Sequence, residues 1–123
     1  MQVAKLDKVF SEYIRRRTEN ENGVVKCCTC PKSYHWKWMD AGHFIDRGHM
    51  ATRWAEMNVH AQCQKCNRLL NGNMKQYKLF LLQEYGPDTI RILTDLGRST
   101  MKYTQADVNE LVKEYKSKLN GKV

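Results

Sequence analysis

Two cysteine pairs with the spacing Cys-x-x-Cys constrain this chain more than any other feature. They are Cys27 with Cys30 and Cys63 with Cys66. Four thiolates held in two tight turns suit one tetrahedral zinc ion, and such an ion keeps no open position for water or substrate. We therefore expect a structural Zn²⁺ that joins distant segments into a small core. The fifth cysteine, Cys28, is expected to be a packed or exposed bystander.

Charge and composition limit the class of protein. The chain has 123 residues, with 21 Lys and Arg against 13 Asp and Glu, and a formal net charge of +8. This length favours one globular domain, and the excess of positive charge favours a nucleic-acid partner. The odd number of cysteines and the charged N-terminal stretch favour a soluble protein in a reducing compartment, the cytoplasm. The longest apolar run, residues 79–82, is far too short to span a bilayer, so no membrane partner is expected.

The spacing of apolar residues predicts helices on both sides of the zinc core. An N-terminal helix is expected over residues 3–18, and C-terminal helices over 74–119, the last capped by Thr104 and Asp107. Between them, residues 34–39 and 41–45 read as paired strands, residues 48–58 as a loop, and the second cysteine pair as the start of a helix. The predicted fold class is α+β, a single domain of residues 1–123. Its core, residues 24–73, is a zinc-bound treble-clef, or ββα-metal, unit.

Several short sequence words around the cysteines are similar to those of a known family. Four of these words occur in an order that resembles the HNH, or ββα-metal, nucleases. They are Cys27-x-x-Cys30, Gly42-His43-Phe44, Asn58-Val59 and Cys63-x-x-Cys66-Asn67. Residues 27–30, 40–45, 51–54 and 58–63 together resemble the NinG family of lambdoid phages, and the likeness extends over most of the chain. It implies a phage protein in the host cell that cuts branched DNA, such as Holliday junctions and D-loops.

The HNH resemblance assigns roles to three residues. His43 matches the histidine that acts as general base, since an imidazole can accept a proton from water near neutral pH. Asn58 matches the asparagine that tethers the loop following that histidine. Asn67 stands where a metal-binding residue follows the last cysteine, although capping the helix is its alternative role. An amide oxygen suits Mg²⁺ or Mn²⁺, the catalytic cofactors that the resemblance implies.

One departure from the HNH pattern leaves the catalytic metal ligands open. Many HNH enzymes carry an acid immediately before the histidine, and this chain has Gly42 there. Asp40 or Asp46 could supply the missing carboxylate, and strand alternation does not choose between them. His49 and Asn71 are further candidate ligands.

The expected DNA contacts come from basic and aromatic residues near His43. Arg47, Arg53 and Arg68 are candidates to grip phosphates, and Trp54 to stack on unpaired bases. Trp36 and Trp38 are expected to pack against the zinc core instead. Apolar stripes on the first and last helices leave a homodimer open. The alternative to a nuclease is a zinc-stabilised module that binds branched DNA or RNA without cutting it.

Overall fold

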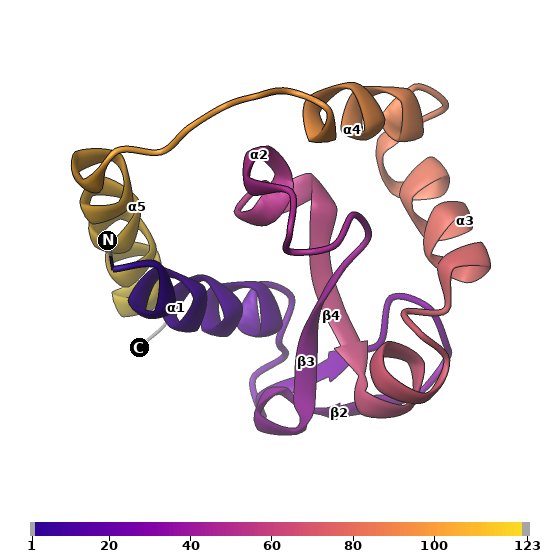
Figure 1. Ribbon diagram of the computed structural model, residues 1–123. Helices are drawn as coiled ribbons and strands as arrows, with labels where there is room; N and C mark the ends of the chain where they lie inside the picture. Colours follow the sequence, from indigo (N-terminus) through magenta and orange to yellow (C-terminus); the bar gives the residue numbers. More distant parts are fainter. Residues whose placement is uncertain (1, 122–123) are drawn as a thin grey trace.

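The computed structural model describes residues 2–121 and has a small α+β fold (Figure 1). Short 3₁₀ turns cover Trp36–Trp38 and Glu56–Asn58, and a π-helical turn covers Lys65–Leu69. The helices and strands, in chain order, are α1 (Val3–Arg16), β1 (Val24–Lys26), β2 (Ser33–His35), β3 (Met39–His43), α2 (Met50–Arg53), β4 (Val59–Cys63), α3 (Met74–Tyr85), α4 (Thr89–Gly97) and α5 (Gln105–Asn120).

Within residues 2–121 the strands form two antiparallel two-stranded sheets. The central sheet pairs β3 with β4, so that Met39 lies opposite Cys63 and His43 lies opposite Val59 (Figure 1). The smaller sheet is the hairpin of β1 and β2. A hydrogen bond from the Cys28 N–H to the Ala61 carbonyl (3.0 Å) joins this hairpin to β4. The first cysteine pair is thereby brought to the end of the central sheet.

The predicted pairing of residues 34–39 with residues 41–45 is wrong. Residues 36–38 close a 3₁₀ turn, in which the Met39 N–H bonds to the Trp36 carbonyl and the His35 ring accepts from the Lys37 N–H (3.2 Å). This turn separates β2 from β3, and β3 finds its partner in the distant β4. The alternation of bulky residues was compatible with a strand, but the pairing partner was decided by contacts far along the chain.

The helices of the structure lie close to the residues at which the sequence predicts them. Helix α3 begins at Met74, the predicted start of the C-terminal helices, and Thr104 and Asp107 form the predicted capping box of α5, with bonds of 3.1 and 2.8 Å. Asn73 precedes α3 but does not cap it with its side chain, which donates to Thr29 O and Cys66 Sγ. The predicted loop over residues 48–58 contains α2 and a 3₁₀ turn. No helix in the described part of the chain is long and apolar enough to cross a membrane.

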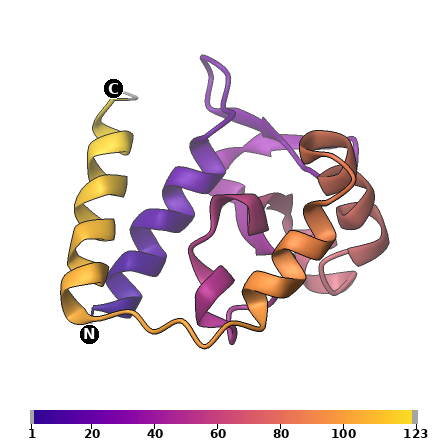
Figure 2. The same ribbon diagram turned by 90° about the horizontal axis from the view of Figure 1, so that it is seen from above.

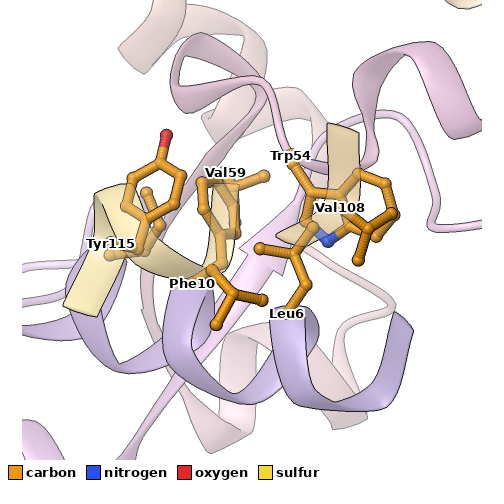
Figure 3. Close-up of a cluster of buried hydrophobic side chains, with 8 residues drawn as sticks. Leu6, Phe10, Trp54, Val59, Val108 and Tyr115 are labelled. Carbon is orange, nitrogen blue, oxygen red and sulfur yellow. The ribbon is translucent and has the colours of Figure 1, made fainter. Parts of the chain in front are cut away.

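The helices from the two ends of the chain share one hydrophobic core. Helices α1 and α5 lie side by side (Figures 1 and 2), and their buried faces meet Trp54 and Val59 from the centre of the chain (Figure 3). The rings of Phe10 and Tyr115 contact edge to face, with centroids 4.9 Å apart. The apolar stripes of the first and last helices therefore cover each other within one chain. The homodimer stays a prediction, and these stripes no longer argue for it.

Candidate functional site

The four cysteines of the two pairs converge on one point. The sulfur atoms of Cys27, Cys30, Cys63 and Cys66 all lie within 4.8 Å of one another. The first pair sits in the loop between β1 and β2, and the second where β4 passes into the π-helical turn. Backbone N–H groups of Thr29 and Cys66 point at sulfurs of the cluster, each at 3.5 Å, as suits thiolates. The chain can therefore hold a metal such as zinc, with the predicted ligands.

Cys28 lies outside this cluster and is partly buried. Burial raises the pKa of its thiol well above the usual value, and the neighbouring Cys27 adds to the effect. It packs against the small core formed by Tyr77, Leu81 and Leu93. This agrees with the packed bystander that the sequence suggested.

A groove of about 680 Å³ lies between α1 and the central sheet. Most of the polar residues predicted to act in catalysis or DNA binding meet there, with contributions from α1, β3, the loop after β3 and the turn after β4. The polar side chains that line it are Asp7, Ser11, Arg15, Lys37, Asp40, His43, Asp46, Arg47, Gln64, Asn67 and Arg68.

His43 stands at the end of β3, and one of its ring nitrogens is anchored. Its Nε2 lies 2.9 Å from the carbonyl oxygen of Arg53. A carbonyl can only accept a hydrogen bond, so Nε2 carries the proton and Nδ1 of the neutral ring carries the lone pair. Burial lowers the pKa of His43, and the positive charge of Arg47 lowers it further. Hydrogen bonds to the backbone of Arg53 and of Ala41 oppose this shift without cancelling it. The ring is therefore held neutral at physiological pH, and it lines the groove.

Asn58 fixes the loop that follows His43. Its side chain is fully buried and accepts from the Ile45 N–H (2.8 Å), while its amide donates to the carbonyls of Ile45 and Thr52 (2.9 and 3.1 Å). These bonds join the start of the loop to the end of α2. Asn58 does not line the groove, so its contacts are those of a tether.

Gly42 has a steric reason to be glycine. A Cβ atom at this position would lie 1.9 Å from Oε1 of Gln62, the buried residue on the neighbouring strand. The Gln62 amide is fixed there by donating to Thr29 Oγ1 (3.0 Å) and to the Gly72 carbonyl (2.8 Å). The space for a carboxylate before His43 is therefore filled by the side chain of Gln62.

Asp40 is the carboxylate most enclosed by partners on the floor of the groove. Its Oδ2 accepts from Asn67 Nδ2 (2.9 Å), and Arg68 donates to both of its oxygens (2.9 and 3.0 Å). Asp46 also lines the groove, but its side chain is 81% exposed. It accepts from the Gly48 N–H (2.9 Å), and His49 Nε2 lies 4.0 Å from the same oxygen. Asp40 and Asn67 thus lie side by side in the groove, joined through the amide nitrogen of Asn67.

Two predicted metal ligands lie outside the groove. His49 Nδ1 lies 3.3 Å from the Gly97 carbonyl, so this ring contacts the end of α4. Asn71 stands four residues after Asn67 and would share its face in a regular α-helix. The π-helical turn ends at Leu69, and Asn71 takes a left-handed conformation (φ 50°), which carries it off that face.

Two predicted DNA contacts are occupied inside the protein. Trp54 is only 5% exposed, belongs to the core shared by α1 and α5, and donates from Nε1 to Asp7 (2.9 Å). It cannot stack on a base, so this expectation is wrong. Arg53 uses its guanidinium to hold Asp7 through both carboxylate oxygens. Arg47 and Arg68 remain at the rim of the groove, with side chains 62% and 60% exposed.

Asp7 of α1 is the main site residue that the sequence did not reveal. It binds Arg53 and Trp54, and lies 3.7 Å from Arg47. Burial opposes its ionised form, but the hydrogen bonds from Arg53 and Trp54 outweigh burial and hold the pKa of Asp7 below its usual value. Arg53 and Trp54 lie 46 and 47 residues along the chain from Asp7, so no local pattern indicates the contact.

Comparison with known proteins places the chain in a family. The family model described as "Bacteriophage Lambda NinG protein" matches residues 2–122. The chain belongs to the NinG family. It is 26% identical over 119 residues to "Protein ninG" of Salmonella phage P22, and 24% identical over 118 residues to that of Escherichia phage lambda. The NinG protein of Escherichia phage 933W is 23% identical over 118 residues.

These alignments cover 95% of this chain and 55–56% of each relative. The chain thus spans about half the length of the NinG relatives that it matches. No solved structure matches the fold.

Proposed function

We propose that this NinG-family protein is a divalent-metal-dependent DNA endonuclease with an HNH-like core, and that the groove is its active site. The observation that carries the proposal is the state of His43. The ring is neutral, its Nε2 proton is directed at the Arg53 carbonyl, and it lines the groove. Phosphodiester hydrolysis needs such a base to take a proton from the attacking water.

The other residues of the groove have roles that fit the same reaction. His43 Nδ1 accepts the proton of the water as its oxygen attacks phosphorus, while the bond from phosphorus to the leaving strand oxygen breaks and that oxygen takes a proton from solvent water. The Arg53 carbonyl stabilises the imidazolium that forms. Asn58 keeps the Arg53 segment in place through the Thr52 carbonyl. Arg47 and Arg68 at the rim are placed to bind phosphate oxygens of the scissile strand.

Asp40 and Asn67 are the residues that would hold the catalytic cation. Mg²⁺ commonly takes one or two protein carboxylates and fills its other positions with water and substrate phosphate, so one acid beside one amide is a sufficient donor set. A bound Mg²⁺ or Mn²⁺ would neutralise the charge that develops on the phosphate. Arg68 now covers Asp40, but its side chain is exposed and free to exchange the carboxylate for a phosphate.

The structural zinc ion would serve the site without taking part in the chemistry. The Met39–Cys63 register places a zinc-binding residue directly opposite the strand that carries Asp40 and His43. Asn67 follows the last cysteine directly, so the ion would fix the position of that amide as well. Branched DNA is the proposed substrate, on the strength of the family resemblance and the net charge of +8.

One observation favours the alternative of a module that binds branched nucleic acid without cutting it. Among residues 2–121, the cysteine cluster is the one group of three or more His, Cys, Asp or Glu side chains whose ligand atoms converge. The groove therefore offers a catalytic cation fewer converging carboxylate ligands than many metal sites have. Arg68 and Asn67 also satisfy Asp40 in the absence of any cation.

Cleavage assays separate the two functions. Purified protein is incubated with a labelled four-way junction and with a linear duplex of matching sequence, with Mg²⁺, with Mn²⁺ and without either. The nuclease proposal expects metal-dependent cutting that favours the junction and that Asp40→Asn abolishes while zinc content is kept. Tight binding of the junction with no cutting under either metal would support the binding module instead.

A further inference from the structure

Trp38 and Tyr34 form an exposed aromatic surface beside the groove. The Trp38 side chain is 67% exposed and that of Tyr34 is 40% exposed, although Trp38 was expected to pack against the zinc core. Both line a separate hollow of about 320 Å³, together with Cys63, Gln64 and Lys65. A tryptophan left uncovered in this way forgoes a large hydrophobic gain, so an exposed aromatic pair indicates a binding surface.

The backbone under this surface is fixed. Trp38 ends the 3₁₀ turn that links β2 to β3, and the next residue, Met39, is buried and paired with Cys63 of β4. Tyr34 lies within β2 and is paired with Val25 of β1. The two rings thus project from positions that the sheets hold, which reduces the entropy lost when a planar ligand stacks on them.

The aromatic surface adjoins the proposed active site. Gln64 lines both the hollow and the groove, so the two share a wall. Lys37, the residue before Trp38, also lines the groove. A nucleic-acid strand whose phosphate lies in the groove therefore has the Trp38 surface within reach of a neighbouring base.

The charges around the surface favour a polyanion over an apolar protein partner. Lys32, Lys37 and Lys65 are exposed, and none of them forms an ion pair with another residue of the described chain. Lysines that interleave with exposed aromatic rings are the pattern of surfaces that bind single-stranded nucleic acid.

We propose that Trp38, supported by Tyr34, is a stacking site for an unpaired nucleobase of the strand held in the groove. Stacking requires a free π-face, which bases at a branch point or in a single strand offer and bases inside a duplex do not. The site therefore provides a physical basis for selecting branched DNA. This inference rests on the proposed function because that function identifies the ligand as DNA, but it does not require that the protein cut the DNA.

The test measures binding without added divalent cation, so that cleavage plays no part. Fluorescence anisotropy gives the affinity of the full chain for a labelled single-stranded oligonucleotide, a four-way junction and a fully paired duplex. Trp38→Ala is expected to weaken single-strand binding by about tenfold or more, and duplex binding by less than about threefold. Trp38→Phe should restore most of the affinity, and Ile92→Ala, which removes an exposed apolar side chain from α4, should leave it unchanged.

A second measurement does not depend on how well the alanine variant folds. Acrylamide quenching of tryptophan fluorescence should fall when the wild-type chain binds the single strand, and should change little in Trp38→Phe, because Trp54 is buried and Trp36 is partly buried. Equal single-strand affinities of wild type and Trp38→Ala would overturn the stacking site and leave this surface to a protein partner. Trp38-dependent binding by a protein that cuts no DNA would retain the stacking site and reject the nuclease.

Discussion

The Nε2 atom of His43 lies 2.9 Å from the main-chain carbonyl oxygen of Arg53. The side chain of the same arginine holds Asp7 on α1, and the adjacent Trp54 donates to that carboxylate as well. The first helix of the chain is thus joined to the proposed general base through one residue. Three segments that are remote in the sequence determine which nitrogen of His43 is free to accept a proton.

Asp7→Asn should destabilise the fold. The substitution removes the charge that Arg53 and Trp54 bind. A hydrogen bond to a charged group contributes about 1.5–3 kcal/mol to stability. We expect the free energy of unfolding, from urea denaturation, to fall by about 2 kcal/mol. Glu110→Gln is the control, because it breaks an exposed ion pair with Lys113 and should change stability by less than about 1 kcal/mol. Equal effects of the two substitutions would contradict the importance of Asp7.

Zinc binding should depend on Cys66 and not on Cys28. Wild-type protein is expected to bind one zinc ion per chain, measured by atomic emission after gel filtration. Cys66→Ser removes one of the four converging sulfurs and should lose the metal and the cooperative thermal transition. Cys28→Ser changes the neighbouring thiol that lies outside the cluster, and it should keep both. Full zinc content in Cys66→Ser would refute the assigned ligand set.

Gly42→Ala should be costly for a steric reason. The new methyl group would collide with Oε1 of Gln62, and forced overpacking typically costs about 1–3 kcal/mol. The double variant Gly42→Ala with Gln62→Ala should be more stable than the sum of the two single effects predicts, because shortening residue 62 removes the clash. Chemical denaturation of the four proteins of this cycle gives the coupling. Strict additivity would show that Gln62 is not what excludes a side chain at position 42.

His60 should make the fold sensitive to acid. It is buried, and its ring contacts the hydroxyl oxygens of Tyr77 (3.2 Å) and Tyr85 (2.7 Å). Burial, with the charge of Arg17, lowers the pKa of His60 to about 3, whereas an unfolded histidine has a pKa of about 6.5. The unfolded chain therefore binds more protons between these values, and stability is lost as pH falls below about 6.5.

The size of this effect follows from linkage. One such histidine contributes a slope of about 1.4 kcal/mol per pH unit to the free energy of unfolding within that window. Denaturation from pH 7 to pH 4 should show the slope reduced in His60→Gln and kept in His49→Gln, which alters an exposed ring. An unchanged slope in His60→Gln would mean that other groups govern acid unfolding.

The features that the sequence predicted correctly are those with local causes. The start of α5 depends on a capping box of residues three positions apart, and each Cys-x-x-Cys pair is a local turn that one metal ion can join to the other pair. The pairing of β3 with β4 depends on residues about twenty positions apart, and the 3₁₀ turn at Trp36–Trp38 was hidden by an alternation that looks like a strand.

The same distinction holds for the site. The HNH resemblance predicted His43 and Asn67, and residue types near His43 predicted Asp40, Arg47 and Arg68. The fold brings all five to one groove. Trp36 packs against the zinc core as predicted, but the burial of Trp54 and of Trp38 was predicted wrongly, because burial is decided by packing partners. Trp54 meets α1 and α5 in the core, whereas Trp38 is left outside. Asp7 carried no signal, since its partners come together only in the folded chain.

The most direct test of the central claim is the single-turnover rate of junction cleavage by wild type and His43→Ala at pH 7 with saturating Mg²⁺. We predict that the variant cuts about 10²–10⁴-fold more slowly, the usual contribution of a positioned base, while its affinity for the junction and its zinc content stay unchanged. As pH falls, the wild-type rate should drop with a midpoint below 6.5, because burial lowers the pKa of His43 from that ordinary value. Cleavage by His43→Ala at the wild-type rate would contradict the assignment of His43 as the general base.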